Sequence, residues 1–365
     1  MKRVDGRQAV QKSISEIRRA SCEKSLRNFA NTYLPAHFRC KPSDMHLELF
    51  ELLENAATEE RGLRLAVAAP RSHAKSTIVS LAYVLWCICY KKEPFIYLIS
   101  HTIDQAADSL SHIKRELQDN PRLQEDFPEV CEVPGTFTGA PRWRKEEIIT
   151  RNNIKVTALG AEKKVRGRRH NEHRPTLIIL DDVEDAEDAR SPDQRRNKME
   201  WFNKSVLKSG TGVTNVIVVG TILHFGSLLA TLLSDKTPGW IKRKYQAVRR
   251  FSENPELWST WESVYRHIEE FEGNGGSKAA EAFFEANREK LLENTDVLWP
   301  EVDDYYKLMV MRIREGRASF DSEKQNEPVN PDECMFQESE FVYWNDEYDT
   351  VEDLIDACNG NCTIY

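Results

Sequence analysis

Short runs of consecutive apolar residues recur between residues 63 and 248, and each predicts a strand of a buried sheet. In chain order the expected strands are 63–68, 95–100, 147–150, 154–159, 177–180, 216–219 and 245–248. The turn Arg151-Asn-Asn separates the third of these runs from the fourth, which predicts a hairpin. Runs without polar alternation are typical of strands that are buried on both faces of a parallel sheet.

Helical segments alternate with these strands. Apolar residues at helical spacing predict helices at 8–33, 42–57, 75–90 and 103–117. Strands that alternate with helices indicate an α/β fold, with a mostly parallel central sheet and helices on both faces. Such sheets bind their ligands beyond the carboxyl ends of the strands.

The pattern changes near residue 252, where the chain becomes helical and rich in tryptophan and charge, through a long helical stretch at 303–318. We therefore expect a main domain at 1–250 with a helical start at 1–57. A small helical lid or linker subdomain is expected at 251–335, and a polar, acidic linker at 336–365.

Composition narrows the class of protein without naming it. The chain has 365 residues, a net charge of −8, 40% hydrophobic and 30% charged residues, as in ordinary globular proteins. No apolar run approaches the roughly 20 residues of a membrane span. The charged start is not followed by the apolar stretch of a signal peptide. We therefore expect a cytoplasmic protein with no membrane partner. The eight cysteines are scattered and are expected to be free thiols, with Cys87 and Cys89 in the core.

The segment after the first predicted strand has the layout of a phosphate-binding loop. It reads Ala69, Pro70, Arg71, Ser72, His73, Ala74, Lys75, Ser76 and Thr77. In such loops backbone N–H groups cradle phosphates, the lysine reaches the β- and γ-phosphates and the hydroxyl after it binds Mg²⁺. Ala69 and Ala74 stand where the common pattern has glycines, so we expect that neither residue needs a positive φ.

A second motif carries the matching carboxylates. The run at 177–180 is followed directly by Asp181 and Asp182, with Glu184 close behind. In phosphate-loop ATPases one acid at this edge helps to hold Mg²⁺ and another orients the attacking water. We assign Asp181 to the metal and favour Asp182 for the water, with Glu184 as the alternative.

Several stretches, taken in order, resemble the large subunit of a tailed-phage terminase, a DNA-packaging motor. The resemblance runs from about residue 42 to 336. It is carried by the loop 69–77, the basic segment 163–170 with Arg174-Pro175, the acids after 177–180, Val218–His224, Asn120–Pro128, Ser319-Phe320 and Gln325–Pro328.

The resemblance implies roles for further residues. Arg71 would reach the γ-phosphate or respond to its loss, and Arg166, or in its place Arg168, would be an arginine finger acting on a neighbouring subunit. The alternative is that this basic segment is a solvated loop or contacts DNA phosphates. Gly220 and Thr221 would couple hydrolysis to movement. His46 would contact the adenine or else lie on the surface of a packed helix.

The function that follows from this resemblance is Mg²⁺-dependent ATP hydrolysis that drives double-stranded viral DNA into a prohead. ATP and Mg²⁺ are the expected cofactors. The expected partners are DNA, the portal protein, the small terminase subunit and further copies of the chain in a ring of five. The protein would work in the host cytoplasm and, transiently, at the portal vertex. No nuclease activity is expected. The alternatives are a helicase-like DNA-dependent ATPase and a non-catalytic nucleotide-binding adaptor for the portal or the small terminase.

Overall fold

The computed structural model describes residues 2–58, 61–131, 143–161, 163, 165–185, 191–266 and 276–328, with side chains from residue 11 onward. The contacts within Met1–Pro328 form one compact unit, and Val329–Tyr365 form a second. The predicted linker 336–365 and the cysteines Cys334, Cys358 and Cys362 lie outside the described residues.

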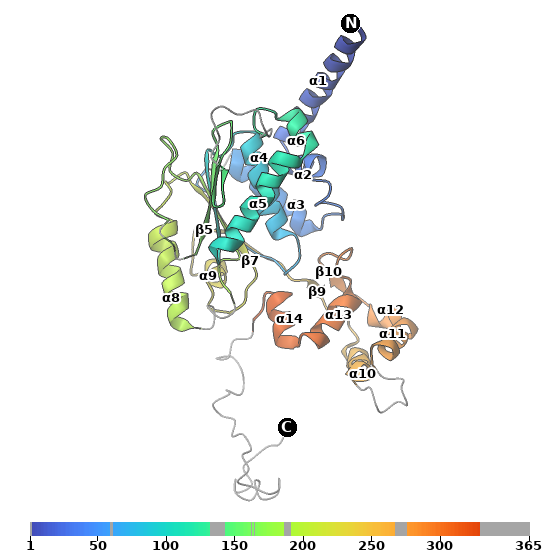
Figure 1. Cartoon of the computed structure of the whole chain (residues 1–365). Coiled ribbons are helices and arrows are strands. Elements are labelled where there is room, and N and C mark those ends of the chain that lie inside the picture. Colours follow the sequence, from blue (N-terminus) through green and yellow to red (C-terminus); the bar gives the residue numbers. More distant parts are fainter. Residues whose placement is uncertain are drawn as a thin grey trace, which may run out of the picture. The chain divides into compact units, whose positions relative to one another are not determined.

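An eight-stranded sheet forms the centre of the first unit (Figure 1). Its spatial order is β3-β4-β5-β2-β6-β7-β1-β8; the five pairings from β5 to β8 are parallel, and β3 and β4 are antiparallel additions at one edge. The strands are β1 (Arg64–Ala68), β2 (Phe95–Ser100), β3 (Trp143–Arg144), β4 (Glu147–Ile149), β5 (Lys155–Gly160), β6 (Leu177–Asp181), β7 (Asn215–Gly220) and β8 (Ile241–Lys244). The mostly parallel sheet and the β4–β5 hairpin are therefore confirmed.

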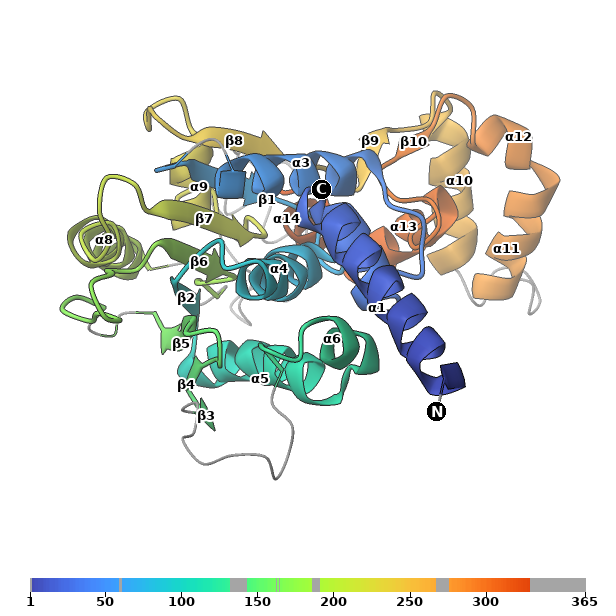
Figure 2. The same cartoon turned by 90° about the horizontal axis from the view of Figure 1, so that it is seen from above.

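Helices cover both faces of this sheet, as predicted. Figure 2 shows α3 (Asp44–Thr58), α4 (Tyr83–Cys89) and α5 (Ile103–Asp119) on one side, and α8 (Pro192–Trp201) and α9 (Leu228–Leu233) on the other. Side chains alternate between the two faces along each strand. Leu65 and Val67 pack with the first group of helices, whereas Ala66 and Ala68 pack with the second.

One predicted strand is wrong. The run 245–248 does not join the main sheet, and the edge strand is instead the polar β8, which precedes it and pairs with β1. An edge strand buries only part of its surface, so it does not need an apolar run. Val248 begins β9 (Val248–Arg250), which pairs with β10 (Asp296–Val297) in a separate two-stranded sheet.

Two long predicted helices are each divided. The helix expected at 8–33 is α1 (Lys2–Glu23) followed by α2 (Leu26–Tyr33), because Ser25 caps a new helix by accepting a hydrogen bond from the Asn28 N–H. The stretch 303–318 is α13 (Tyr305–Arg314) followed by α14 (Arg317–Glu323), divided at Gly316 with φ 84°. The helix after the phosphate loop begins at Lys75 and contains a π-helical turn at Thr77–Ala82.

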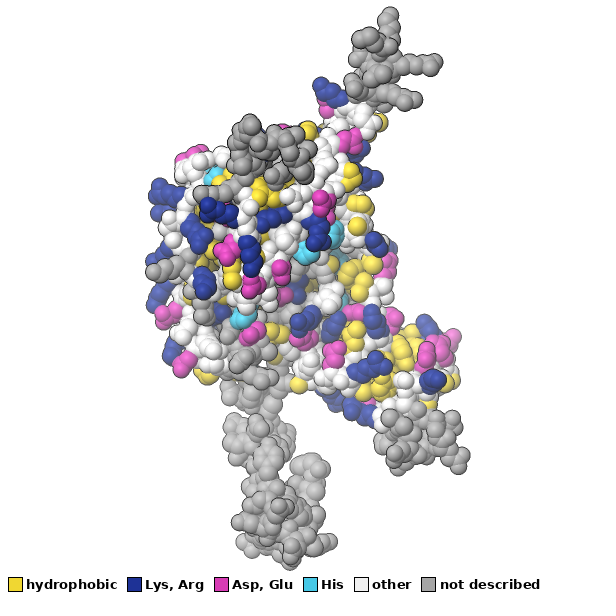
Figure 3. All heavy atoms as spheres, in the orientation of Figure 1, with side chains coloured by type: hydrophobic (Ala, Val, Ile, Leu, Met, Phe, Trp, Pro, Cys, Tyr) yellow, Lys and Arg dark blue, Asp and Glu magenta, His cyan; other side chains and the backbone are white. Residues whose placement is uncertain are grey.

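The C-terminal helical segment, defined here as α10–α14, has its own core. Its other helices are α10 (Pro255–Arg266), α11 (Ser277–Ala286) and α12 (Arg288–Leu291). Trp258, Trp261, Phe284 and Tyr305 are buried together with aromatic ring contacts between them. The face of the molecule drawn in Figure 3, by contrast, carries charged side chains of both signs.

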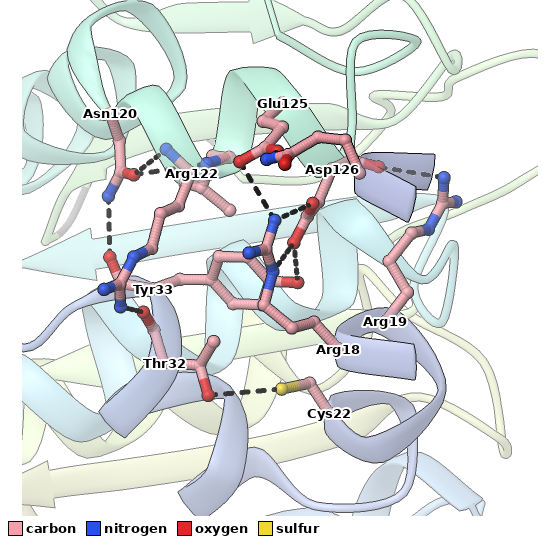
Figure 4. Close-up of polar contacts among 11 residues, drawn as sticks. Arg18, Arg19, Cys22, Thr32, Tyr33, Asn120, Arg122, Glu125 and Asp126 are labelled. Atoms are coloured by element: carbon pink, nitrogen blue, oxygen red, sulfur yellow. Dashed lines mark hydrogen bonds and ion pairs between the residues drawn. The ribbon is translucent and has the colours of Figure 1, made fainter. Parts of the chain in front are cut away.

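The N-terminal helix is fixed by a polar network (Figure 4). Arg18 donates to both carboxylate oxygens of Asp126, at 2.8 and 2.6 Å, and the Tyr33 hydroxyl donates to the same carboxylate at 2.8 Å. Asp126 ends α6 (Pro121–Asp126), and the N-cap of that helix is Asn120. The segment Asn120–Pro128, one of the stretches that resemble terminases, therefore ties α1 and α2 to the sheet domain.

The described cysteines, including Cys87 and Cys89, are free, and these two are buried in α4, as predicted. Among the described residues, no helix is long and apolar enough to cross a membrane.

Candidate functional site

The predicted phosphate loop leaves the carboxyl end of β1, between β7 and β8. The Ala69 N–H donates to the Gly220 carbonyl at 3.0 Å, and the Tyr245 N–H donates to the Ala68 carbonyl at 2.9 Å. The loop then turns and enters the helix at Lys75. The loop is therefore tied to the strands on both sides from its first residue.

The backbone of this loop corrects one expectation. Ser72 and Ala74 have φ values of 67° and 55°, so the second of the two alanines does adopt a positive φ. Ala69 does not. A left-handed conformation costs a residue with a Cβ about 1–2 kcal/mol, which the contacts around the loop must offset.

Two histidines form part of that support. The Ser43 N–H donates to His46 Nδ1 at 2.9 Å, so His46 Nε2 carries the proton and donates to the His73 carbonyl at 3.0 Å. Both ring nitrogens of His46 are used and its side chain is buried, so the predicted surface position is wrong, while the base contact stays a prediction. Burial lowers the pKa of His46, and it lowers that of His73 to about 4.

Lys75 meets two of the other predicted site residues. Its Nζ donates to Thr221 Oγ1 at 3.1 Å and lies 3.5 Å from Asp182 Oδ2. Thr221 Oγ1 donates in turn to the Ala69 carbonyl at 3.3 Å. The lysine is 5% exposed, so this cation is held in a fixed position at the edge of the sheet.

Asp181 ends β6 beside the start of this helix. Its carboxylate accepts hydrogen bonds from Ser76 Oγ at 2.9 Å and from Ser80 Oγ at 2.6 Å. Burial and the neighbouring charge of Asp182 raise the pKa of Asp181, although the two serine hydrogen bonds and Lys75 oppose the shift. Ser80 was not predicted from the sequence, and only its place one helical turn after Ser76 would have indicated it.

The other two acids differ in their surroundings. Asp182 is held by its backbone, with φ 44°, while its side chain is 54% exposed. A Cβ added at Gly220 would lie 3.0 Å from Asp182 Oδ1, so the glycine leaves room for this carboxylate. Glu184 Oε2 accepts a hydrogen bond from the Leu228 N–H at 2.7 Å and so is bound to the start of α9.

Arg71 points to the C-terminal helical segment. Its guanidinium donates to both carboxylate oxygens of Glu323, at 2.7 and 2.9 Å, and its backbone N–H donates to the Glu323 carbonyl. Lys324 Nζ donates to the Arg71 carbonyl at 3.1 Å and to Asp303 Oδ2 at 2.9 Å. The loop is thus held by residues about 250 positions away, which the sequence analysis did not identify.

The residues after Lys324 contact the end of β7. The Ile222 N–H donates to Asn326 Oδ1 at 2.9 Å, and Asn326 Nδ2 donates to the Tyr245 carbonyl at 2.8 Å. Gln325 exchanges two hydrogen bonds with the backbone of Val248. The stretch Gln325–Pro328, noted in the sequence only as a resemblance, therefore connects the C-terminal helical segment to the candidate coupling residues.

The described contacts do not join Arg166 or Arg168 to this group. After β5 the chain crosses the sheet face that α8 and α9 cover, because Val165 is buried there and Trp201 Nε1 donates to the Lys163 carbonyl. His170 then contacts the Asn153 carbonyl, before the start of β5. The segment ends at the amino edge of the sheet, opposite the phosphate loop.

A cavity of about 240 Å³ adjoins the phosphate loop on its other side. Ala74, Ile78, His46, Phe50, Phe38 and Trp299 contribute to its mostly apolar wall. Among the described residues, no group of three or more His, Cys, Asp and Glu side chains is arranged to hold a metal ion. Magnesium needs no such cage when one or two protein groups and substrate phosphates supply its ligands.

Comparisons with known proteins now bear on the fold. No family model matches the chain, and no curated protein matches it. Several solved structures do match, and two of them are described here. The chain is similar to a terminase ATPase domain. The match to the large terminase ATPase domain of Thermus phage P74-26 has 15% identity and a TM-score of 0.36, and covers 80% of this chain and all of that one. A mutant form of the same domain gives 14% identity, a TM-score of 0.37 and 79% coverage of this chain. The resemblance stated from the sequence is to the same kind of protein, and the function is argued from the site itself.

Proposed function

We propose that this chain is a Mg²⁺-dependent ATPase that drives double-stranded viral DNA into a prohead. The observation that carries the proposal is one cluster at the carboxyl edge of the sheet. There Lys75, Ser76, Asp181 and Thr221 come together from three separate segments, with hydrogen bonds of 2.9–3.1 Å between them. A buried lysine and a hydroxyl–carboxylate pair after a β-strand loop form a nucleotide phosphate site.

The residues present fit a magnesium ion bound together with a nucleotide. Ser76 Oγ and Asp181 lie together, and an incoming cation would replace the hydrogen bond between them. A bound cation would also offset the burial that raises the pKa of Asp181, because it favours the ionised carboxylate. When bound, the ion supplies charge neutralisation for the phosphate oxygens.

The nucleotide base would use the cavity beside Ala74. Its apolar wall of Phe38, Phe50 and Trp299 suits a flat ring, and its volume of about 240 Å³ lies directly beside the loop. His46 would act indirectly, by fixing the His73 carbonyl and hence the loop.

Asp182 is the better candidate to orient the attacking water. Its carboxylate is exposed and lies 3.5 Å from Lys75 Nζ, whereas Glu184 is bound to the backbone at Leu228. A general base must have a free oxygen within hydrogen-bond reach of the water. Glu184 would first have to leave the start of α9.

Movement would pass from the site through its contacts with the C-terminal helical segment. Arg71 is bound to Glu323, and Thr221 lies next to Ile222, whose N–H is bound to Asn326. A γ-phosphate that attracted Arg71 or Lys75 would compete with these contacts. Loss of the phosphate would restore them, which supports Gly220 and Thr221 as coupling residues.

The arginine finger, if supplied by this loop, must act between subunits. Arg166 and Arg168 line a hollow toward the amino edge of the sheet, while the phosphate loop lies at the carboxyl edge. We propose that a neighbouring copy in a ring, expected to have five members, receives this arginine. The portal and the small terminase subunit are the proposed further partners in the host cytoplasm, with the motor working at the portal vertex.

The test is ATP hydrolysis with Mg²⁺ at rising protein concentration for the parent, Lys75→Ala, Arg166→Ala and a control, Lys236→Ala. The control removes the same charge from an exposed lysine outside the site. Lys75→Ala should lose at least about 10²-fold in rate, the scale seen when one preorganised donor to a transition state is removed. Specific activity that rises with concentration and falls in Arg166→Ala would support the trans finger.

Two results would contradict parts of this proposal. Turnover that is unchanged in Lys75→Ala would place the active site elsewhere. ATP binding without turnover at any concentration, also with DNA and portal added, would favour the nucleotide-binding adaptor.

A further inference from the structure

A strongly basic hollow lies away from the candidate nucleotide site. Its volume is about 690 Å³, and Arg166, Arg168, Arg169, Arg174 and Lys208 line it together with Gly167 and Ser209. The five cations come from two segments, one before β6 and one before β7. Among the described residues that line it, no side chain is acidic.

These cations have no ionic partner in the part of the chain that the structure describes. All five are exposed, and none forms an ion pair or side-chain hydrogen bond with another described residue. The nearby carboxylate of Glu172 is paired instead with His173, at 3.0 Å. Five positive charges held close together repel one another, so an anion bound there would be stabilised by all of them.

The backbone around the hollow is firmly placed. The Tyr97 hydroxyl donates to the Val165 carbonyl at 3.1 Å, and His170 and His173 exchange two backbone hydrogen bonds. Thr214 Oγ1 donates to the Pro175 carbonyl at 2.7 Å. The arginines therefore project from a fixed frame.

The position of the hollow separates it from the phosphate loop of the same chain. Arg174 lies three residues before β6 begins, and Lys208 lies before β7, so both are at the amino edge of the sheet. The central strands β1, β2, β5, β6 and β7 have five or six residues each, so the amino and carboxyl edges of the sheet are about 17–20 Å apart. Figure 3 shows Lys and Arg side chains gathered on the side where Figure 1 draws the loops beyond β5.

We propose that Arg169, Arg174 and Lys208 of this basic hollow bind the phosphate backbone of duplex DNA, while Arg166 and Arg168 stay the candidate fingers. The inference takes duplex DNA from the proposed function but requires no ATP hydrolysis. The described lining of this open hollow has five cations and no aromatic side chain, so it suits phosphates and offers no surface for stacking bases. The chain as a whole carries a charge of −8 and repels DNA, so binding depends on a local patch of this kind.

Contacts with DNA phosphates fix the position of the protein on the duplex and do not read its base sequence. Each phosphate neutralised by a cation contributes about 0.9 to the slope of log K against log salt concentration. Removing cations from the hollow should therefore weaken binding to every duplex and flatten its salt dependence.

The experiment measures binding of a fluorescent duplex by anisotropy over a range of salt concentrations, without nucleotide. The variant Arg169→Ala/Arg174→Ala/Lys208→Ala spares both candidate fingers. The control, Lys236→Ala/Arg250→Ala/Lys290→Ala, removes the same charge from exposed positions elsewhere. The hollow variant should bind the duplex at least about 10-fold more weakly than the parent near 0.1 M salt. Its slope of log K against log salt concentration should be smaller by about 2–3, while the slope of the control should fall by less than about 1.

Equal losses in the two variants would overturn the proposal, because net charge alone would then account for them. Parent-like binding by the hollow variant would also overturn it. Displacement of the duplex by micromolar tripolyphosphate would show a site for small phosphates instead. A parent that binds DNA through this hollow but hydrolyses no ATP would leave this inference standing and contradict only the proposed function.

Discussion

The predicted phosphate loop and the basic hollow are both rich in positive charge, but they differ in whether their cations are paired with carboxylates. Arg71 and Lys75 lie within 3.5 Å of the carboxylates of Glu323 and Asp182, and Lys324 and His46 hold the loop backbone. The cations of the hollow have no such partners among the described residues.

The comparison indicates that the two proposed anion sites differ in kind. A site whose charges are paired in advance is preorganised for one ligand geometry, and a bound ligand replaces the contacts within the protein. A site whose charges are exposed and unpaired suits a ligand that arrives in many registers, as a DNA backbone does. Substitutions should therefore affect folding at the first site and binding alone at the second.

The largest effect on stability should come from Lys324→Met. Lys324 and Asp303 form an ion pair at 2.9 Å in which both side chains are less than 10% exposed. Removing the cation leaves a buried carboxylate with Lys307 as its remaining partner, which should lower the free energy of unfolding by about 3 kcal/mol. Urea unfolding measures this loss, and Lys324→Met/Asp303→Leu is the control that should recover part of it. A loss below about 1 kcal/mol would mean that the pair does not hold the loop.

The same pair predicts a pH dependence. Burial by itself would raise the pKa of Asp303, but its hydrogen bonds with Lys324 and Lys307 and their charges lower it overall. A lowered pKa stabilises the folded state above the ordinary carboxylate pKa near about 4, and this contribution is lost as the pH falls through the folded-state value. The difference between the parent and Lys324→Met should be complete at neutral pH and shrink in acid. A difference that stays constant down to about pH 3 would contradict this.

Ala74→Gly should have a smaller effect of opposite sign. Glycine relieves the left-handed backbone at φ 55°, worth about 1–2 kcal/mol, and its greater freedom in the unfolded chain costs about 0.5–1 kcal/mol. The free energy of unfolding should therefore rise by up to about 1.5 kcal/mol. Ala69→Gly, at a position without positive φ, is the matched control and should destabilise. Equal losses in the two variants would show that the loop carries no strain at Ala74.

The smallest effect on stability should come from Arg169→Ala/Arg174→Ala in the hollow. Neither side chain has a described partner to lose, so the free energy of unfolding should change by less than about 0.5 kcal/mol. Thermal unfolding at low salt measures this, where relief of repulsion would show as a small gain. A loss of more than about 1 kcal/mol would reveal a structural role and remove the contrast between the two regions.

The sequence by itself determined the central strands β1, β2, β5, β6 and β7, their alternation with helices and the place of the predicted phosphate loop after β1. Runs such as 95–100 and 177–180 fix a buried strand because apolar side chains on both faces can be satisfied only inside a sheet. The place of the acids after Leu180 follows from this strand assignment. Parallel strands bring their carboxyl ends to one edge of the sheet, so these acids lie at the same edge as the loop after β1. The contact of Lys75 with Asp182 was therefore foreseeable.

Only the tertiary structure decided which groups hold that loop in place. The polar strand β8, the left-handed Ala74, the hydrogen bonds of His46 and the contacts of Glu323 and Lys324 leave no local signal, because each depends on a partner distant in the chain. Arg71 and Glu323 are 252 residues apart, and no periodicity or turn preference connects them. Local dihedral and hydrophobic preferences act over a few residues, whereas the pairing of charges is settled when the whole chain has folded.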